Sequence, residues 1–319
     1  MSLLLKLTLA TAPKVNLHRI TPTLPPILPQ QEPTLALETN TQQHITQLLW
    51  QNPNPRVDKY GKVVGNQHQL LFIQNHQQFA FNQKDGVQKF QNQQHQVFAH
   101  TFLDRGLITA TAHSLTCRES QIGQPIVVQS EIDIDASSVL TSLGQGRLLV
   151  ATPESDASFG IFLVEEEKTV KIAGNLQDVR GMGVTSDESK LLVSAGDSIL
   201  QACLPVDGDT IEFLQMTEWA SVSAPGALAV DEASNVYICS RDGVIVLDED
   251  AEQVLSVETS SKVTGCCFGG ELASELYISC GGCVWMLPTS QQGASVRSVE
   301  LKSQIAKQVG AGDFRHDGW

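Results

Sequence analysis

Two cysteines, Cys280 and Cys283, are separated by two glycines, a spacing found in redox motifs and in zinc half-sites. A redox pair needs its first thiol at a helix N-terminus, which lowers the thiol pKa. These cysteines instead flank a predicted two-residue hairpin turn. The neighbouring Cys266 and Cys267 would point to opposite faces of a strand, so both cannot bind one ion. The pattern therefore favours structural thiols.

The other residue types that catalyse or bind metals show no productive spacing. His68, His76, His95 and His100 follow no short ligand pattern within a Gln- and Asn-rich stretch, which we interpret as solvated polar loops around a weak first repeat. The chain contains no Gly-rich phosphate loop, Gly-x-Ser-x-Gly elbow or His-Glu-x-x-His motif. A Ser-His-Asp triad is defined only in three dimensions, so spacing does not test it.

The elements that must position these residues are repeated β-hairpins. Residues 236–247 and 276–287 each place two short apolar runs around a Gly-containing turn. Similar runs begin at Leu70, Leu107, Leu148 and Leu191, which gives six starts that lie 37, 41, 43, 45 and 40 residues apart. This is the length of a four-stranded propeller blade, and one blade cannot bury both of its faces alone. The sequence predicts an all-β fold, a six-bladed β-propeller.

We divide the chain into three parts. Residues 1–60 hold eight of the thirteen prolines and form a predicted extended extension, with candidate strands at 3–9 and 44–50, one of which we expect to complete a blade. Residues 61–303 form the predicted propeller. Residues 304–319 form a tail without a strand pattern.

Charge and cysteine usage narrow the function classes. The formal net charge of −14 argues against nucleic acid and against an anionic membrane surface as partners, since both need clustered cations. The seven cysteines, an odd number, indicate reduced thiols and a cytoplasmic protein. The apolar residues 1–12 are interrupted by Lys6 and are too few to span a bilayer.

Two stretches carry a family resemblance. Residues 180–193, which begin Arg-Gly-Met-Gly-Val, and residues 225–238, which begin Pro-Gly-Ala-Leu-Ala-Val, resemble the regucalcin / gluconolactonase / luciferin-regenerating enzyme family. Residues 265–270 and 275–279 are similar to the family's last blade, and the resemblance extends over about 138–287. It implies a six-bladed propeller that hydrolyses small lactones or esters with a divalent cation at the mouth of its central channel.

The resemblance also implies where that cation would be bound. The family uses a Glu, an Asn and an Asp from its first, fourth and fifth blades, oxygen ligands that suit calcium or magnesium. These positions fall on Tyr60, Arg180 and Gly226, and a further substrate-binding stretch falls near Ser138. A guanidinium is a permanent cation that would repel a divalent ion. We therefore expect no metal or other cofactor, unless a divalent cation such as calcium is held in an altered site.

Three functions follow from this pattern. The first is a lactonase or esterase whose ligands lie elsewhere in the chain. The second is a non-catalytic propeller whose channel mouth, near Tyr60, Ser138, Arg180 and Gly226, binds a small anion or whose rim docks a protein. The third is a reaction without a metal. No catalytic residue is assigned.

Overall fold

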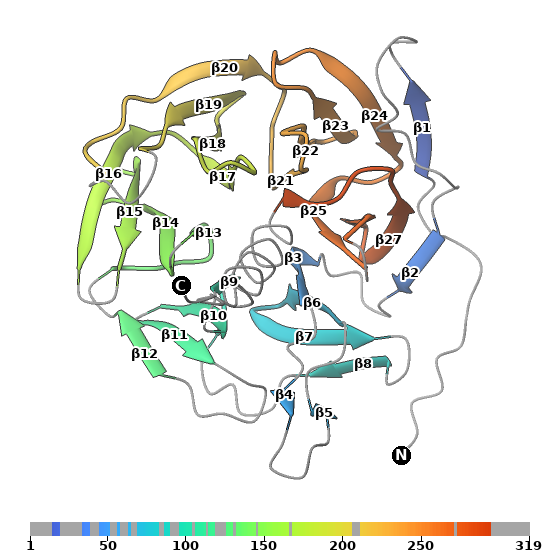
Figure 1. The fold of residues 1–319 in the computed structure, drawn as a ribbon, viewed down its shortest axis with the longest axis horizontal. Helices are drawn as coiled ribbons and strands as arrows, with labels where there is room; N and C mark the ends of the chain where they lie inside the picture. Colours follow the sequence, from blue (N-terminus) through green and yellow to red (C-terminus); the bar gives the residue numbers. More distant parts are fainter. Residues whose placement is uncertain are drawn as a thin grey trace, which may run out of the picture.

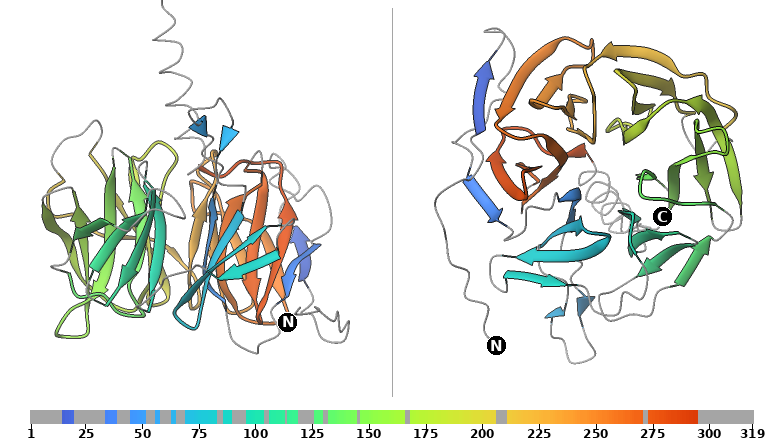
Figure 2. Two further views of the ribbon diagram at one scale, coloured as in Figure 1. Left: turned by 90° about the horizontal axis from the view of Figure 1, so that it is seen from below. Right: turned by 180° about the vertical axis from the view of Figure 1, so that it is seen from behind.

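The computed structural model describes residues 15–19, 34–38, 45–51, 56–57, 63–64, 69–82, 86–89, 96–103, 106–112, 114–118, 126–129, 132–144, 146–165, 168–205, 211–270 and 273–294. These residues form six sheets arranged radially around an axis (Figure 1), a six-bladed β-propeller as the repeat spacing predicted. Seen from the edge, the strands run roughly along that axis (Figure 2). Among the described residues, no helix has the length and apolar character needed to cross a membrane.

Each blade is an antiparallel meander that starts at the axis and ends at the outside. The innermost strands of blades one to six are β3 (Thr46–Gln51), β9 (Ala99–Leu103), β13 (Val139–Leu143), β17 (Val179–Val184), β21 (Leu228–Val230) and β25 (Val263–Gly269). Each of them contacts the innermost strands of both neighbouring blades, and β25 contacts β3 to close the ring. Because all blades repeat the same meander, the six strands run the same way along the axis.

The second and third strands form the hairpins that the sequence predicted. The second strands are β6 (Gln69–Gln74), β10 (Gly106–Thr111), β14 (Arg147–Pro153), β18 (Lys190–Ala195), β22 (Val236–Cys239) and β26 (Glu275–Cys280). The third strands are β7 (Gln77–Asn82), β11 (Ser114–Arg118), β15 (Phe159–Val164), β19 (Ser198–Cys203), β23 (Gly243–Leu247) and β27 (Cys283–Pro288). All six predicted starts therefore fall on or next to the first residue of a second strand.

The fourth strands follow the third strands in sequence, except in blade six. They are β8 (Gly86–Lys89), β12 (Ile126–Gln129), β16 (Thr169–Leu176), β20 (Thr217–Ser221), β24 (Gln253–Thr259) and, in blade six, β2 (Thr34–Glu38). β1 (Val15–Arg19) adds a fifth strand to blade five by pairing with β24. β4 (Arg56–Val57) and β5 (Val63–Val64) form a separate two-stranded sheet.

The candidate at 44–50 supplies a strand to blade one, and a further strand that the sequence analysis did not single out closes the ring. Residues 44–50 overlap β3, the innermost strand of blade one, whereas β2 completes blade six by pairing with β27. β2 lies in the proline-rich stretch that we expected to be extended coil. A register shift between Leu35 and Leu37 interrupts the regular alternation, so Leu37 is buried although Leu35 is exposed. The candidate at 3–9 and the tail at 304–319 lie outside the described residues.

The core lies between the blades and consists mainly of Leu, Ile, Val and Ala side chains, with Tyr237 and Phe72 as the largest fully buried residues. Such packing suits blades whose two faces are both covered. None of the seven cysteines forms a disulfide; five are buried, Cys267 is half-buried and Cys203 is exposed.

Candidate functional site

Three of the four predicted site residues lie at or just before the start of an innermost strand. Ser138 precedes β13, Arg180 is the second residue of β17, and Gly226 lies two residues before β21. Since the innermost strands share one direction, all three lie on the face of the ring where these strands begin, called here the upper face. Tyr60 lies outside the described residues.

Arg180 is placed by a β-bulge. Val179 pairs with Ala195 and Gly181 pairs with Ser194, so Arg180 is left as the extra residue between two paired positions. A bulge of this kind turns the side chain of its extra residue away from the regular pleat. The same irregularity occurs at the start of β25, between Val263 and Gly265.

The guanidinium of Arg180 contacts two groups from neighbouring loops. Its Nη2 donates to Oδ2 of Asp178 in an ion pair, and its Nη1 donates to the carbonyl oxygen of Pro225 at 3.4 Å. The side chains of Arg180 and Asp178 are 37% and 55% exposed, so solvent reaches both charges. Asp178, Arg180 and Pro225 are called the Arg180 site below.

Gly226 is held by its backbone, next to this site. Its N–H donates to the carbonyl of Cys239 at 2.7 Å, and its carbonyl accepts from the Ser194 hydroxyl at 2.7 Å. A Cβ added at Gly226 would meet nothing nearer than 3.5 Å, an ordinary contact. The packing around Gly226 therefore tolerates a Cβ at the position where the resemblance implies an Asp.

Ser138 contributes little to the upper face. Its side chain is 1% exposed, and its hydroxyl hydrogen bonds with the Thr152 hydroxyl at 2.9 Å. The same hydroxyl accepts from the Asp135 N–H at 3.0 Å. These partners occupy the hydroxyl, so Ser138 fixes the loop that leads into β13.

The loops around the Arg180 site contain non-glycine residues in the left-handed region. The φ angles are 58° at Asn175, 52° at Asp178 and 48° at Ala224. Asp197 stabilises the turn at Ala224. Its Oδ1 accepts from the Ala224 N–H at 3.0 Å, and its carbonyl accepts from the Val222 N–H at 3.1 Å. Such conformations persist only where the surroundings impose them.

The donor atoms at these positions do not fit the divalent cation that the resemblance implies. Arg180 and Gly226 supply a cation and no side chain, and the carboxylate nearest to them, that of Asp178, is already paired with Arg180. Among the described residues, no three His, Cys, Asp or Glu side chains lie close enough together to bind a metal ion. A hard cation needs several oxygen ligands at once.

The Cys-Gly-Gly-Cys pair flanks a two-residue turn, as predicted. Cys280 pairs with Cys283, and Gly281 and Gly282 have φ angles of 58° and 82°, the type I′ geometry of a tight hairpin. Burial raises the pKa of Cys280 to about 11. Burial and then Glu38 raise the pKa of Cys283. Both thiols are therefore protonated at neutral pH and are poor nucleophiles.

His100 departs from the solvated loops that we predicted for the histidines. It is 4% exposed, and its Nδ1 lies 2.9 Å from Nε2 of Gln78, while its backbone N–H donates to the Gln47 side chain at 3.1 Å. Burial lowers the pKa of His100 to about 3, so the ring is neutral. No residue pattern predicts this burial, because the contacts come from blade one and His100 belongs to blade two.

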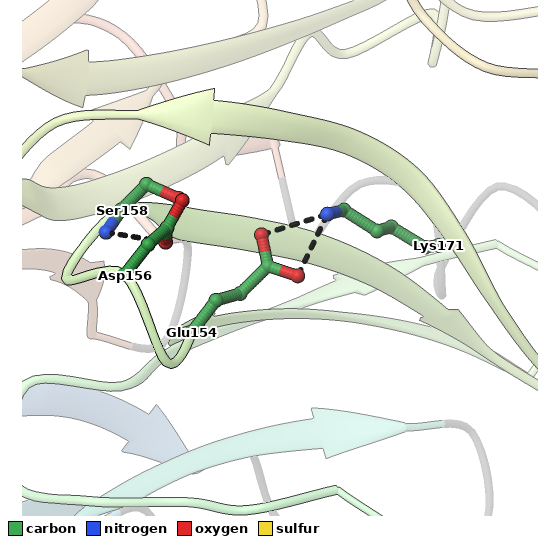
Figure 3. A network of polar contacts seen from close by, with 4 residues as sticks. All are labelled: Glu154, Asp156, Ser158 and Lys171. Carbon is green, nitrogen blue, oxygen red and sulfur yellow. Dashed lines mark hydrogen bonds and ion pairs between the residues drawn. The ribbon is translucent and has the colours of Figure 1, made fainter.

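A second polar cluster lies at the β14–β15 turn of blade three (Figure 3). The ammonium of Lys171 contacts both carboxylate oxygens of Glu154 at 2.7 Å, and Asp156 accepts from the Ser158 hydroxyl at 2.6 Å. These hydrogen bonds from Ser158 lower the pKa of Asp156. The cluster is solvated, and an exposed pair of this kind contributes about 0–1 kcal/mol to stability.

Comparisons with known proteins identify the fold. Neither protein-family models nor curated proteins match the sequence. Among solved structures, a candidate gluconolactonase superposes with a TM-score of 0.68 at 14% identity, over 87% of this chain and 99% of the other. A gluconolactonase from Xanthomonas campestris gives 0.60 at 17% identity, over 85% and 100%. A calcium-binding regucalcin from Agrobacterium tumefaciens gives 0.61 at 12%, over 81% and 95%.

The chain is thus a six-bladed β-propeller. More particularly, it has the fold of the gluconolactonase and regucalcin propellers, in agreement with the resemblance at residues 138–287. At identities below one fifth, this likeness establishes the fold and leaves the chemistry to the residues of this chain.

Proposed function

We propose that this protein is a non-catalytic propeller that binds a small carboxylate-bearing molecule on its upper face, through the guanidinium of Arg180. The observation that carries this proposal is the placement of Arg180. Arg180 lies on a bulge at the start of an innermost strand, and Asp178 and the Pro225 carbonyl anchor its guanidinium. The resemblance aligns Arg180 with a metal ligand of the family, which supports a role in binding.

A guanidinium can take over one role of a bound cation and not the other. It holds a carboxylate or carbonyl oxygen through charge-assisted hydrogen bonds, often in pairs. It does not lower the pKa of a coordinated water, which is how a metal ion generates a nucleophile at neutral pH. Ligand binding without hydrolysis is the function that these residues support best. We further propose a cytoplasmic location, which the absence of disulfides among the seven cysteines supports.

Calorimetric titration with acetate tests the proposal. Arg180→Gln should weaken acetate binding by about tenfold or more, since charged hydrogen bonds contribute about 1.5–3 kcal/mol. Lys171→Gln is the matched control, because it removes an equal charge from blade three without touching the Arg180 site. Equal acetate affinities for the wild type and Arg180→Gln would overturn the proposal.

The alternative function is the lactone hydrolysis named for two of the similar structures. It predicts a stoichiometric divalent cation and hydrolysis of gluconolactone that a chelator abolishes. We expect elemental analysis of the purified chain to find no such ion, and we expect EDTA to change neither hydrolysis nor acetate binding. A chelator-sensitive lactonase activity would favour the alternative.

A further inference from the structure

The Arg180 site contains two opposite charges side by side, and both retain unused hydrogen-bonding atoms. Arg180 uses Nη1 and Nη2 for Pro225 and Asp178, which leaves further guanidinium N–H donors. Asp178 accepts through Oδ2, and its Oδ1 has no partner among the described residues. A ligand at this site therefore meets a positive donor and a negative acceptor together.

The charge balance of the site favours a ligand that carries both charges over a simple anion. The carboxylate of Asp178 offsets most of the field of Arg180 at short range, and the whole chain carries a formal charge of −14. A free monoanion therefore gains less from this surface than a ligand that also contacts Asp178. A ligand with a carboxylate and an ammonium would gain from both side chains and would add no net charge.

The backbone fixes this arrangement before any ligand arrives. Asp178 itself has a left-handed backbone, and so does Ala224, whose turn presents the Pro225 carbonyl to Arg180. Asp197 holds the Ala224 turn through the Ala224 and Val222 N–H groups. Preorganised polar groups contribute more to affinity because less conformational entropy is lost on binding.

We propose that the Arg180 site binds a small zwitterion of the α-amino acid type, with its carboxylate on Arg180 and its ammonium on Oδ1 of Asp178. The inference rests on the proposed function, in that Arg180 is the carboxylate-binding group. It adds the ammonium contact, and it assigns Asp178 as the residue that selects the ligand.

Titrations of the full chain with glycine, acetate and methylammonium separate the carboxylate contact with Arg180 from the ammonium contact with Asp178. The wild type should bind glycine about tenfold more tightly than acetate, because the ammonium adds one charge-assisted contact. Asp178→Asn should lower glycine affinity to the level of acetate and leave acetate binding equal or stronger. Arg180→Gln should weaken both. Methylammonium should bind more weakly than glycine to the wild type.

The outcomes distinguish a failure of the ammonium contact from a failure of the carboxylate site. Equal affinities of glycine and acetate for the wild type, or an equal loss of both in Asp178→Asn, would overturn the zwitterion and leave the carboxylate site standing. If neither ligand binds, the proposed function fails as well. Both side chains are partly exposed, so the variants should fold, and an unchanged thermal midpoint checks this.

Discussion

At the scale of single residues, the positions that the resemblance assigns to metal ligands carry other residue types in this chain. Arg180 and Gly226 occupy the positions where the resemblance implies an Asn and an Asp. The space beside Gly226 admits a side chain, since an added Cβ would lie 3.5 Å from the Cys239 carbonyl oxygen. The side chains that the resemblance implies at these two positions are therefore missing, while the backbone at Gly226 leaves room for a Cβ.

Restoring the ligands should restore the ion. We predict that the triple variant Tyr60→Glu, Arg180→Asn, Gly226→Asp binds calcium, because two carboxylates and an amide would replace a guanidinium, a phenol and a bare backbone. Calcium titration calorimetry should show binding to the triple variant and none to the wild type or to Arg180→Asn alone. Calcium binding by the wild type would show that these positions do not define its ion site.

A double substitution tests how Asp197 positions the site. Asp197→Ala should weaken acetate binding by several-fold, because the Ala224 turn loses its hydrogen bond to Oδ1. Adding Ala224→Gly should recover much of that loss, since glycine adopts the left-handed conformation without the steric cost. If Asp197 served only overall stability, the second change would restore no affinity.

Asp231 gives a prediction about pH. This carboxylate is fully buried and accepts from the side chains of Asn235 and Tyr237, and burial raises its pKa above the usual 3.8. Because the folded-state pKa is the higher one, the proton stabilises the folded protein below pH 3.8, and this stabilisation is lost as pH rises through the raised pKa.

Urea denaturation across that range checks the sign. The free energy of unfolding of the wild type, relative to that of Asp231→Asn, should fall as pH rises from below 3.8 and should then level off. Asn cannot ionise, so the variant lacks this contribution. A wild type that gains stability over the variant with rising pH would contradict the raised pKa.

At the scale of elements, sequence reasoning succeeded where a pattern repeats and failed where contacts cross between elements. The hairpins that follow Arg180 and Gly226 in the sequence predicted their places, and the structure has Arg180 at the start of β17 and Gly226 just before β21. The ion pair between Arg180 and Asp178 depends on the bulge, which no residue pattern predicts. Likewise, Ser138 lies just before an innermost strand, but its hydroxyl is hydrogen bonded to the Thr152 hydroxyl at the end of β14, which the sequence pattern did not predict.

The approach of blade four to blade five depends on a glycine. A Cβ at Gly181 would lie 2.3 Å from the Gly226 carbonyl oxygen and 2.9 Å from the Cα of Ala227, both backbone atoms that cannot rotate away. Gly181→Ala should therefore cost about 1–3 kcal/mol of unfolding free energy by overpacking.

Gly183, on the same strand, is the matched control for this effect. A Cβ there would lie 3.3 Å from a methyl group of Val230, which can yield by a few tenths of an ångström. Urea denaturation should show Gly183→Ala to be clearly milder than Gly181→Ala. Equal losses would mean that strand propensity, and not the approach of the two blades, sets the cost.

At the scale of the whole molecule, the ring is closed by residues far apart in the sequence. β2 pairs with β27, and Thr264 of blade six donates its hydroxyl to the Ile45 carbonyl that leads into blade one. Leu37 of β2 packs with Phe72 and Leu70 of blade one and with Tyr277 and Val284 of blade six. One short strand therefore joins the last blade to the first, and the ring should unfold as a unit.

Two leucines on β2 test that claim. Leu37→Ala should lower the unfolding free energy by about 2–5 kcal/mol, the cost of a cavity in a core. Leu35→Ala, at an exposed position on the other side of the register shift between the two leucines, should change it by less than about 0.5 kcal/mol. Each blade depends on its neighbours to cover its two faces. Leu37→Ala should therefore shift one cooperative transition, which Trp fluorescence and far-UV circular dichroism report alike. A separate early transition seen by only one probe would mean that the blades beside β2 unfold independently. The closing strand would then stabilise only these blades and not the rest of the ring.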